Sequence, residues 1–531
     1  MKTKMLFCVF FISTCLFSTI INVPANQPTI QAGIVTAADT DTVLVADGTY
    51  YENINFIGKA ITVASNFLID ADPLHIENTI INGSQPEDPD YGSCVRFRSG
   101  EGSFSVITGF TIMEGTGYYY PGEGFFGGGI LCESASPSII SNIITSNSAD
   151  GSGGIECYVN SSPKILNNLI SNNTVSLVAG GIDCWNNSNP FIQGNQIINN
   201  AANKAGGIMI SNSSPTLINN IIIGNSANVD SGAIQIQTGS QPIFYNNIIS
   251  NNTANQDGGC IVIENAGVNL INCTMSGNSC GNNGGCLYVS FGVNLILVNT
   301  IFEGNQAYEG SEIYFYDSDN VNISFCDFFN DENVFGGLVP TWLETITGIN
   351  YYDIPCDDSL NIYEDPMFTG NFEDPFSLSS VSPCVDTGIQ DVTGLNLPLF
   401  DIIGNPRIAD GRGDGIALID IGAYELPETG GVYQHQIPVT EYQLSNYPNP
   451  FNPTTKIDYA LPAESDVILS IYNIRGQLVK KIKQNDQPAG YHHVYWHGKD
   501  NNSKSVASGV YFYRITAEAE YENVRKMVLL R

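Results

Sequence analysis

The sequence predicts an all-β protein that consists of a parallel β-helix solenoid followed by a small β-sandwich. Residues 128–313 carry one pattern about seven times, and each copy opens with two small residues and an apolar one. A fixed period in this range is typical of solenoid proteins. The last residues of the triplets are 25 to 27 positions apart: Ile130, Ile155, Ile182, Ile208, Ile234, Cys260 and Cys286.

Short strands and turns fill this period. Each copy holds Ile-, Val- and Leu-rich runs of three to five residues, interrupted by Gly, Asn, Ser and Pro. A second pattern recurs halfway through, in Ser162–Ile170, Ser214–Ile222 and Gln241–Ile249. These runs indicate strands, because none is long enough for a helix. Three short strands and three turns use roughly 22–28 residues, which fits one coil of a β-helix.

Asparagine recurs at two turns of the coil. Side-chain amides stacked about 4.8 Å apart bond along the stack, and Asn also tolerates the left-handed conformation of a sharp corner. We therefore expect two Asn ladders in a shaft of roughly 10–12 coils. The first set is Asn142, Asn168, Asn195, Asn220 and Asn247, and the second is Asn147, Asn173, Asn200, Asn225, Asn252, Asn278 and Asn305.

With these repeats, the chain resembles the right-handed, pectate-lyase-like β-helix superfamily over roughly residues 27–335. We assign residues 23–335 to the β-helix and its N-terminal cap. Residues 28–38 have helical apolar spacing, with Ile30 and Ile34 one turn apart, and would plug the open end of the first coil. The segments 84–92 and 115–126 are longer than a turn and should loop off the shaft.

The N-terminus predicts export. Residues 1–22 read as a secretory signal peptide, because Met1–Lys4 is charged and the apolar run from Met5 to about Ile21 follows it. Cys15 leaves a lipoprotein as an alternative. No later segment offers the roughly 20 apolar residues of a membrane span. We expect a secreted protein that is extracellular or on the outer cell surface.

Residues 336–427 are expected to close the other end of the shaft. The motifs Ser382-Pro383-Cys384 and Asp420 to Glu425 resemble the closing module called choice-of-anchor Q, over roughly residues 360–426. Cys356 and Cys384 are the best disulfide candidates, since oxidising surroundings permit disulfides. The cysteines of the repeats are expected to point inward as buried thiols.

A linker at 428–441 precedes the last domain, 442–531. About seven short alternating strands in this stretch suggest an immunoglobulin-like sandwich. The motifs Tyr447-Pro448-Asn449-Pro450-Phe451, Ser508–Arg514 and Arg525–Arg531 resemble the type A C-terminal sorting domain of type IX secretion. That resemblance implies that secretion machinery is a partner, and that this domain directs export and surface anchoring.

The charge of the chain limits its partners. The net charge is −33, and residues 1–440 hold 44 of the 53 acidic residues but 9 of the 20 basic ones. Nucleic acid is excluded as a partner, because binding it requires that phosphates be neutralised. Polyanionic polysaccharides are disfavoured unless a divalent cation bridges them.

Two carboxylates form the candidate site. Residues that follow each triplet should face outward, and this places Glu156 and Asp183 on adjacent strands about 4.8 Å apart. Tyr158 and Trp185 are the next outward pair. Paired acids beside aromatic rings suit a retaining glycosidase, sugar binding or calcium binding, and the competing interpretation is a solvated acidic face. The expected outward column is Leu131, Glu156, Asp183, Met209, Gln235, Ile261 and Leu287.

Other catalytic patterns are absent from the repeats. They contain no histidine, and their lysines, Lys164 and Lys204, lack the acid pairs of a lyase site. The loop Asp410–Gly415 alternates acids and glycines, so Asp410 and Asp414 are candidate calcium ligands, although a simple turn explains them as well.

The sequence therefore favours an exported β-helix protein that binds an extracellular or cell-surface polysaccharide. A polysaccharide lyase or glycoside hydrolase is the first alternative, and a passive spacer is the second.

Overall fold

The computed structural model describes residues 18–427 and 443–529, apart from gaps at 318, 331–332, 372–373, 448–452, 464, 474, 488–489, 502–503 and 518–520. Most of the expected signal peptide, the linker at 428–441 and the Pro-Asn-Pro-Phe part of the secretion motif lie outside the described residues.

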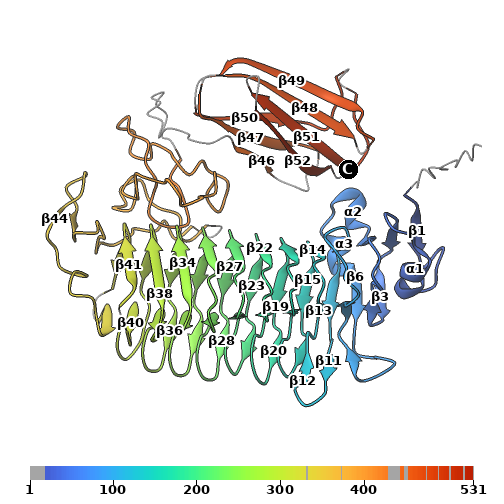
Figure 1. Ribbon diagram of the computed structural model, residues 1–531, viewed down its shortest axis with the longest axis horizontal. Coiled ribbons are helices and arrows are strands. Elements are labelled where there is room, and N and C mark those ends of the chain that lie inside the picture. The colour runs from blue at the N-terminus through green and yellow to red at the C-terminus, as the bar shows by residue number, and fades with distance from the viewer. Residues whose placement is uncertain are drawn as a thin grey trace, which may run out of the picture.

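Three parallel sheets form the shaft (Figure 1), and their stacking confirms the parallel β-helix, with about twelve turns. Sheet 1 has 11 strands: β4 (Ile54–Asn55), β8 (Val95–Phe97), β13 (Ile130–Glu133), β17 (Ile155–Tyr158), β21 (Ile182–Trp185), β25 (Ile208–Ser211), β29 (Ile234–Gln237), β33 (Ile261–Glu264), β37 (Leu287–Val289), β40 (Ile313–Phe315) and β43 (Phe335–Gly337). Sheet 2 has 12 strands: β1 (Ile20–Val23), β2 (Thr42–Val45), β5 (Thr62–Ser65), β9 (Val106–Thr108), β14 (Ser138–Ile140), β18 (Lys164–Leu166), β22 (Phe191–Gln193), β26 (Thr216–Ile218), β30 (Ile243–Tyr245), β34 (Gly267–Ile271), β38 (Asn294–Val298) and β41 (Val321–Ser324). Sheet 3 has 11 strands: β3 (Gly48–Tyr51), β6 (Thr79–Asn82), β10 (Thr111–Met113), β15 (Ile143–Thr145), β19 (Leu169–Ser171), β23 (Gln196–Ile198), β27 (Ile221–Ile223), β31 (Ile248–Ser250), β35 (Thr274–Ser276), β39 (Ile301–Glu303) and β42 (Asp327–Phe329).

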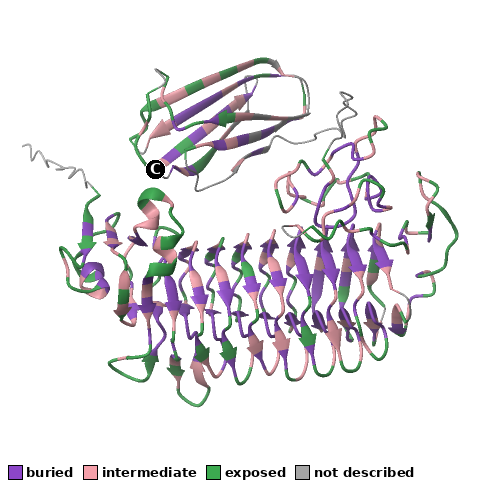
Figure 2. Ribbon diagram, turned by 180° about the vertical axis from the view of Figure 1, so that it is seen from behind, coloured by how far each residue is buried: buried purple, intermediate pink, exposed green. Residues whose placement is uncertain are grey.

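Inward side chains of the three sheets form one continuous apolar core along the shaft, which Figure 2 shows as buried strands. Each coil places a residue above its counterpart, so that Ile155 pairs with Ile182 and Ile182 pairs with Ile208. All three are fully buried. Burial of such a side chain contributes about 1.5–3 kcal/mol to stability. Each added coil therefore adds a similar amount to the stability of the shaft.

Both expected Asn ladders are confirmed. In the first ladder, each side-chain amide donates to the side-chain oxygen of the Asn one coil on, at 2.9–3.1 Å from Asn142 to Asn247. In the second, the same contact runs from Asn147 to Asn305 at 2.9–3.0 Å. Glu312 ends the second ladder, since its carboxylate accepts from the Asn305 amide. These bonds satisfy polar groups at turns that are shielded from water.

The left-handed corner residue precedes the ladder asparagine, so our expectation that the ladder residue itself takes this conformation is wrong. The ladder amide has to point inward, whereas the corner residue faces outward. The corner residues of the first ladder have φ between 53° and 66°: Ser141, Asn167, Gly194, Asn219 and Asn246.

The repeat register shifts by one residue at Gly258. Ile234 pairs with Ile261 rather than with Cys260. Gly258 takes the left-handed place that Ser231 holds one coil earlier, both with φ of 63°. Gly258 therefore belongs to the turn, although in the sequence it resembled the first residue of a small-small-apolar triplet. The outward positions expected for Ile261 and Leu287 are wrong as a result, because these residues occupy the inward position. Cys260 and Cys286 precede that position in the register, but both thiols are buried in the shaft core, as expected.

A short helix covers the first coil, as expected. Helix α1 (Ile30–Thr36) packs Ile30 and Ile34 into the core. The backbone N–H groups of its first turn donate to the Glu52 carboxylate at 2.9 Å, and Lys59 Nζ donates to its last carbonyls at 2.6–2.8 Å. These side chains satisfy the end groups that a helix leaves unpaired. Two further short helices, α2 (Phe67–Asp70) and α3 (Leu74–Asn78), lie beside the next coils.

The far end of the shaft is covered by the chain that follows β43. Val339, Trp342, Leu343 and Tyr363 pack against the shaft core. The chain then forms a two-stranded hairpin of β44 (Gly348–Ile349) and β45 (Pro355–Cys356). Residues 384–426, which we expected to close this end, instead lie along the flank of the last coils (Figure 1). That part of the expectation is wrong, because corner residues of several coils bind this segment.

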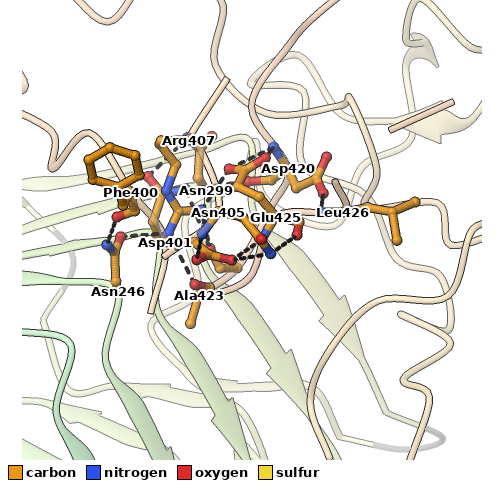
Figure 3. A network of polar contacts seen from close by, with 12 residues as sticks. Asn246, Asn299, Phe400, Asp401, Asn405, Arg407, Asp420, Ala423, Glu425 and Leu426 are labelled. Atoms are coloured by element: carbon orange, nitrogen blue, oxygen red, sulfur yellow. Dashed lines mark hydrogen bonds and ion pairs between the residues drawn. The ribbon is translucent and has the colours of Figure 1, made fainter. Parts of the chain in front are cut away.

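Arg407 fastens the flank segment to the shaft (Figure 3). Its buried guanidinium pairs with Glu425 at 2.7 Å and donates to the side-chain oxygen of Asn246 at 2.6 Å. Asn246 is a shaft corner residue, and its amide donates to the carbonyl of Phe400 at 2.8 Å. Arg407 and Glu425 both belong to the flank segment, so their buried ion pair holds the guanidinium in place, and the hydrogen bonds between Arg407, Phe400 and Asn246 make the contact with the shaft.

The last described residues form an immunoglobulin-like sandwich with its own core, as predicted. One sheet consists of β46 (Gln443–Tyr447), β47 (Thr455–Leu461) and β50 (Gly490–Trp496). The other consists of β49 (Leu478–Gln487), β48 (Ser465–Asn473), β51 (Gly509–Ala517) and β52 (Tyr521–Leu529). Trp496, Tyr459 and Tyr513 are its largest buried side chains.

The eleven described cysteines are free thiols. Cys132, Cys157 and Cys184 point inward on successive strands and are fully buried, as expected. The expected disulfide between Cys356 and Cys384 is wrong, because the Cys384 thiol instead donates to Asp327 Oδ2 at 3.1 Å.

Candidate functional site

Glu156 and Asp183 lie side by side on the outer face of sheet 1. Strands β17 and β21 pair in register, which also places Tyr158 beside Trp185. The exposure of the acids differs from our expectation, because Glu156 and Asp183 are each only 1% exposed. The interpretation of these acids as a solvated acidic face is therefore wrong.

Neighbouring loops cover this outer face. They begin at an edge strip of six two-residue strands: β16 (Ser148–Ala149), β20 (Thr174–Val175), β24 (Ala201–Ala202), β28 (Ser226–Ala227), β32 (Thr253–Ala254) and β36 (Ser279–Cys280). The chain then turns back toward sheet 1 through left-handed residues such as Ala179 and Ala205, and the left-handed Gly127 makes the same turn after the strand Gly124–Phe126. Gly127 packs on Glu156, since an added Cβ would lie 3.0 Å from the Glu156 Cβ, and the two alanines pack on Met209.

Few hydrogen-bond donors reach the two acids. Within the described part of the chain, Glu156 Oε2, both carboxylate oxygens of Asp183 and the hydroxyl of nearby Ser152 are buried without a hydrogen-bond partner. Burial raises the pKa of Asp183 to about 7, although the neighbouring backbone N–H of Cys184 lowers it. Burial and the charge of Asp183 hold the pKa of Glu156 well above its usual range. The site therefore favours retention of a proton by the pair.

An aromatic row extends from Trp185 toward the N-terminal end of the shaft. Neighbouring ring centroids in this row are 5.2–6.1 Å apart. Trp185 is 40% exposed at one end, so part of the row faces solvent. The row consists of Tyr91, Tyr118, Tyr120, Tyr158 and Trp185.

Three of these tyrosines come from segments that we expected only to loop off the shaft. The segments instead form a small antiparallel sheet of β7 (Tyr91–Gly92), β11 (Gly117–Tyr120) and β12 (Gly124–Phe126). We did not assign Tyr91, Tyr118 and Tyr120 to the site. The run Tyr118-Tyr119-Tyr120 could have indicated that Tyr118 and Tyr120 lie on the same face, because alternate residues of a strand share one face.

Charged groups brace the aromatic row. The guanidinium of Arg98 lies 3.9 Å from the ring centroid of Tyr118 and pairs with the Glu133 carboxylate. Tyr120 Oη donates to the same carboxylate at 3.1 Å. Burial and the charges of Glu133 and Glu156 raise the pKa of Tyr120, so its hydroxyl stays protonated. These contacts fix the ring positions before any ligand binds.

The Asp410–Gly415 loop is a turn that the Asp410 carboxylate holds together. That carboxylate accepts from the backbone N–H groups of Gly413, Asp414 and Gly415 at 2.6–3.0 Å. Asp414 Oδ2 accepts from Tyr352 Oη at 3.0 Å. Calcium at Asp410 and Asp414 stays a prediction. Among the residues with described positions, no group of three or more His, Cys, Asp or Glu is arranged to hold a metal ion.

The stacked parallel coils, the two Asn ladders and the buried outer acids define a β-helix solenoid protein with an immunoglobulin-like C-terminal domain. The model of the right-handed β-helix region matches residues 60–222, 98–256 and 180–353, which together span more than half of the chain. The chain therefore belongs to the right-handed β-helix family. The FlgD Ig-like domain matches residues 451–521.

Three solved structures are similar to parts of this chain. Pectate lyase Pel9A is 13% identical, with a TM-score of 0.37, and the match covers 77% of this chain and 96% of Pel9A. Latent PorU and the type-IX secretion component PorZ, both from Porphyromonas gingivalis, are 17% and 18% identical, each with a TM-score of 0.15. They match 17% and 23% of this chain, which covers only 9% and 14% of their own lengths. No curated protein matches it.

No helix in the described segments is long and apolar enough to cross a membrane.

Proposed function

We propose that this protein is exported to the cell surface and binds a neutral polysaccharide through the aromatic row on sheet 1. The observation that carries the proposal is the row itself, five rings in contact, with Trp185 open to solvent. Aromatic faces suit the apolar faces of sugar rings. Tyr158 and Trp185 lie on stacked strands, so this part of the row follows the stacking direction of the coils.

The charged groups around the aromatic row indicate which class of polysaccharide the site would bind. Arg98 is neutralised by Glu133, and Glu156 lies beneath the row. Arg96, whose guanidinium lies 5.3 Å from the Tyr91 ring centroid, donates to the backbone carbonyls of Tyr91 and Asn53, and the partly exposed Glu133 carboxylate can accept hydrogen bonds from sugar hydroxyls. A neutral polysaccharide fits this chemistry better than a uronic-acid polymer.

Removal of the exposed Trp185 ring is expected to lower the affinity of the site for sugar. Trp185→Ala should weaken binding of a neutral oligosaccharide by about 1–3 kcal/mol, because ring stacking supplies the affinity. The measurement is a glycan array followed by calorimetry on each glycan that binds.

Tyr308→Ala is the matched control for this experiment, because Tyr308 is 84% exposed and lies outside the row. Equal binding by the parent and Trp185→Ala would contradict the proposal and favour the spacer alternative. Release of new sugar ends by the parent, lost in Asp183→Asn, would favour the lyase or hydrolase alternative. Burial of both acids counts against that alternative, since a substrate cannot reach them unless the loops open.

We propose that the C-terminal sandwich carries the export and anchoring role. Support comes from the resemblance of its motifs to sorting domains and from its separate core. Deleting residues 447–531 should therefore leave the protein in the periplasm with a folded shaft, because each unit buries its own side chains. Cell fractionation and limited proteolysis measure this result. Unchanged surface display of the deleted chain would contradict the sorting role.

A further inference from the structure

The coil of Gln235 shows how this fold satisfies buried polar groups at the position of Glu156. Ser231 precedes Gln235 by four residues, as Ser152 precedes Glu156, and their strands stack in one sheet. Ser231 Oγ donates to Gln235 Oε1 at 2.6 Å. Gln235 Nε2 donates to the Glu264 carboxylate at 3.1 Å. One amide thus closes the network between neighbouring strands.

The equivalent network at Glu156 lacks a donor. A carboxylate replaces the amide, and its neighbour Asp183 is also an acid, so Ser152 supplies the one hydroxyl hydrogen. Two ionised carboxylates buried on neighbouring strands would repel each other without compensation. A proton between the two carboxyl groups removes one charge and supplies the missing donor.

We propose that Glu156 and Asp183 share one proton, and that this proton keeps Tyr158 and Trp185 in their sugar-binding arrangement. The effect of this proton on sugar binding rests on the proposed function. Each acid is two residues before one ring on the same strand, so repulsion between the acids would push the two strands apart beneath the row. Rising pH releases the proton to solvent, leaves two charges and weakens sugar binding.

The surroundings of the pair favour proton sharing over compensation by a fixed cation. Tyr120 and Glu133 are the ionisable groups nearest on the outer side, and Cys157 and Cys184 lie on the inward side. Arg98 pairs with Glu133, while Lys204 on the adjoining loop pairs with Asp230 at 3.5 Å. The raised pKa values of both acids agree with a retained proton.

Glu156→Gln tests the proposal on the full chain. Its amide should donate permanently to its register partner Asp183 and so replace the titrating proton, as the Gln235 amide donates to Glu264, which lies two residues further along the next strand. The parent should lose roughly tenfold in affinity for the array-selected neutral oligosaccharide between about pH 6 and about pH 9, and Glu156→Gln less than about twofold. Glu264→Gln is the matched control on the same sheet and should keep the parent's pH dependence.

Trp185 fluorescence gives a readout that needs no sugar. Subtracting the emission of the matching Trp185→Phe variant isolates the signal of Trp185. That signal should change with pH in the parent and stay constant in Glu156→Gln. Asp183→Asn serves as a second test if Glu156→Gln does not fold. If no glycan binds at any pH, the proposed function fails, and the fluorescence result still decides whether the proton is shared.

Two results would overturn the inference. The first is a Glu156→Gln fluorescence profile with the same pH dependence as the parent. The second is a parent whose melting temperature rises with calcium and falls with chelator at constant pH, with both effects lost in Glu156→Gln. That second result would show that the pair holds a cation instead of a proton.

Discussion

Replacing Asn200 with alanine is expected to lower the free energy of unfolding of the shaft by about 3–4 kcal/mol. Asn200 is fully buried in the second ladder. Its amide donates to Asn225 at 3.0 Å and to the Ile170 carbonyl at 2.9 Å, and its oxygen accepts from the Asn173 amide at 2.9 Å. Alanine would leave several buried polar groups without partners. Urea unfolding followed by circular dichroism measures the loss.

Asn228→Ala is the control for the ladder prediction. Asn228 is exposed in the loop between two coils, so this change should stay within about 0.5 kcal/mol of the parent. Similar losses in both variants would mean that the ladder contributes no more than an ordinary surface asparagine.

Replacing Glu312 with glutamine is expected to stabilise the protein at about pH 9 and to change little at about pH 4. Glu312 is buried at the end of the second ladder. Burial raises its pKa from 4.5 to about 8, although hydrogen bonds from Asn305 and Asn330 lower it in part. Between these values the folded state keeps a proton that the unfolded state has released. The parent therefore loses stability as pH rises across this window.

The loss from Glu312 alone is on the order of 5 kcal/mol at most, because each unit of pKa shift corresponds to about 1.4 kcal/mol. The glutamine side chain has no charge to bury, so the variant should lose less stability over the same range. Urea unfolding at several pH values measures both slopes, and Glu87→Gln at an exposed position is the control. Equal slopes for the parent and Glu312→Gln would contradict the prediction.

The candidate site was predictable in part from alternation along the strands. The sequence alone indicated that Glu156 and Asp183 are neighbours and that Tyr158 and Trp185 follow them, because stacked coils repeat the same positions. The burial of the acids was not predictable in this way. It depends on Gly127 and on loops from other coils, and their path is set by local backbone turns.

The repeat pattern predicted the wrong register at one coil, where a turn glycine resembled the first residue of a triplet. Gly258 followed by Gly259 read as the start of a triplet, although Gly258 supplies the left-handed turn. Ladder spacing would have corrected the register, because Asn225 and Asn252 are 27 residues apart, as are Ile234 and Ile261.

By itself, the sequence determined the shaft, its ladders, its helical cap and its separate C-terminal sandwich, since each depends on local periodicity or on contacts one coil away. The tertiary structure decided three other features: the docking of residues 384–426 on the flank, the aromatic row and the cover over the acids. All three join segments that no period relates, as Arg407 joins Asn246 across 161 positions. Such contacts depend on complementary shape and hydrogen bonding between distant segments, which a repeat pattern does not encode.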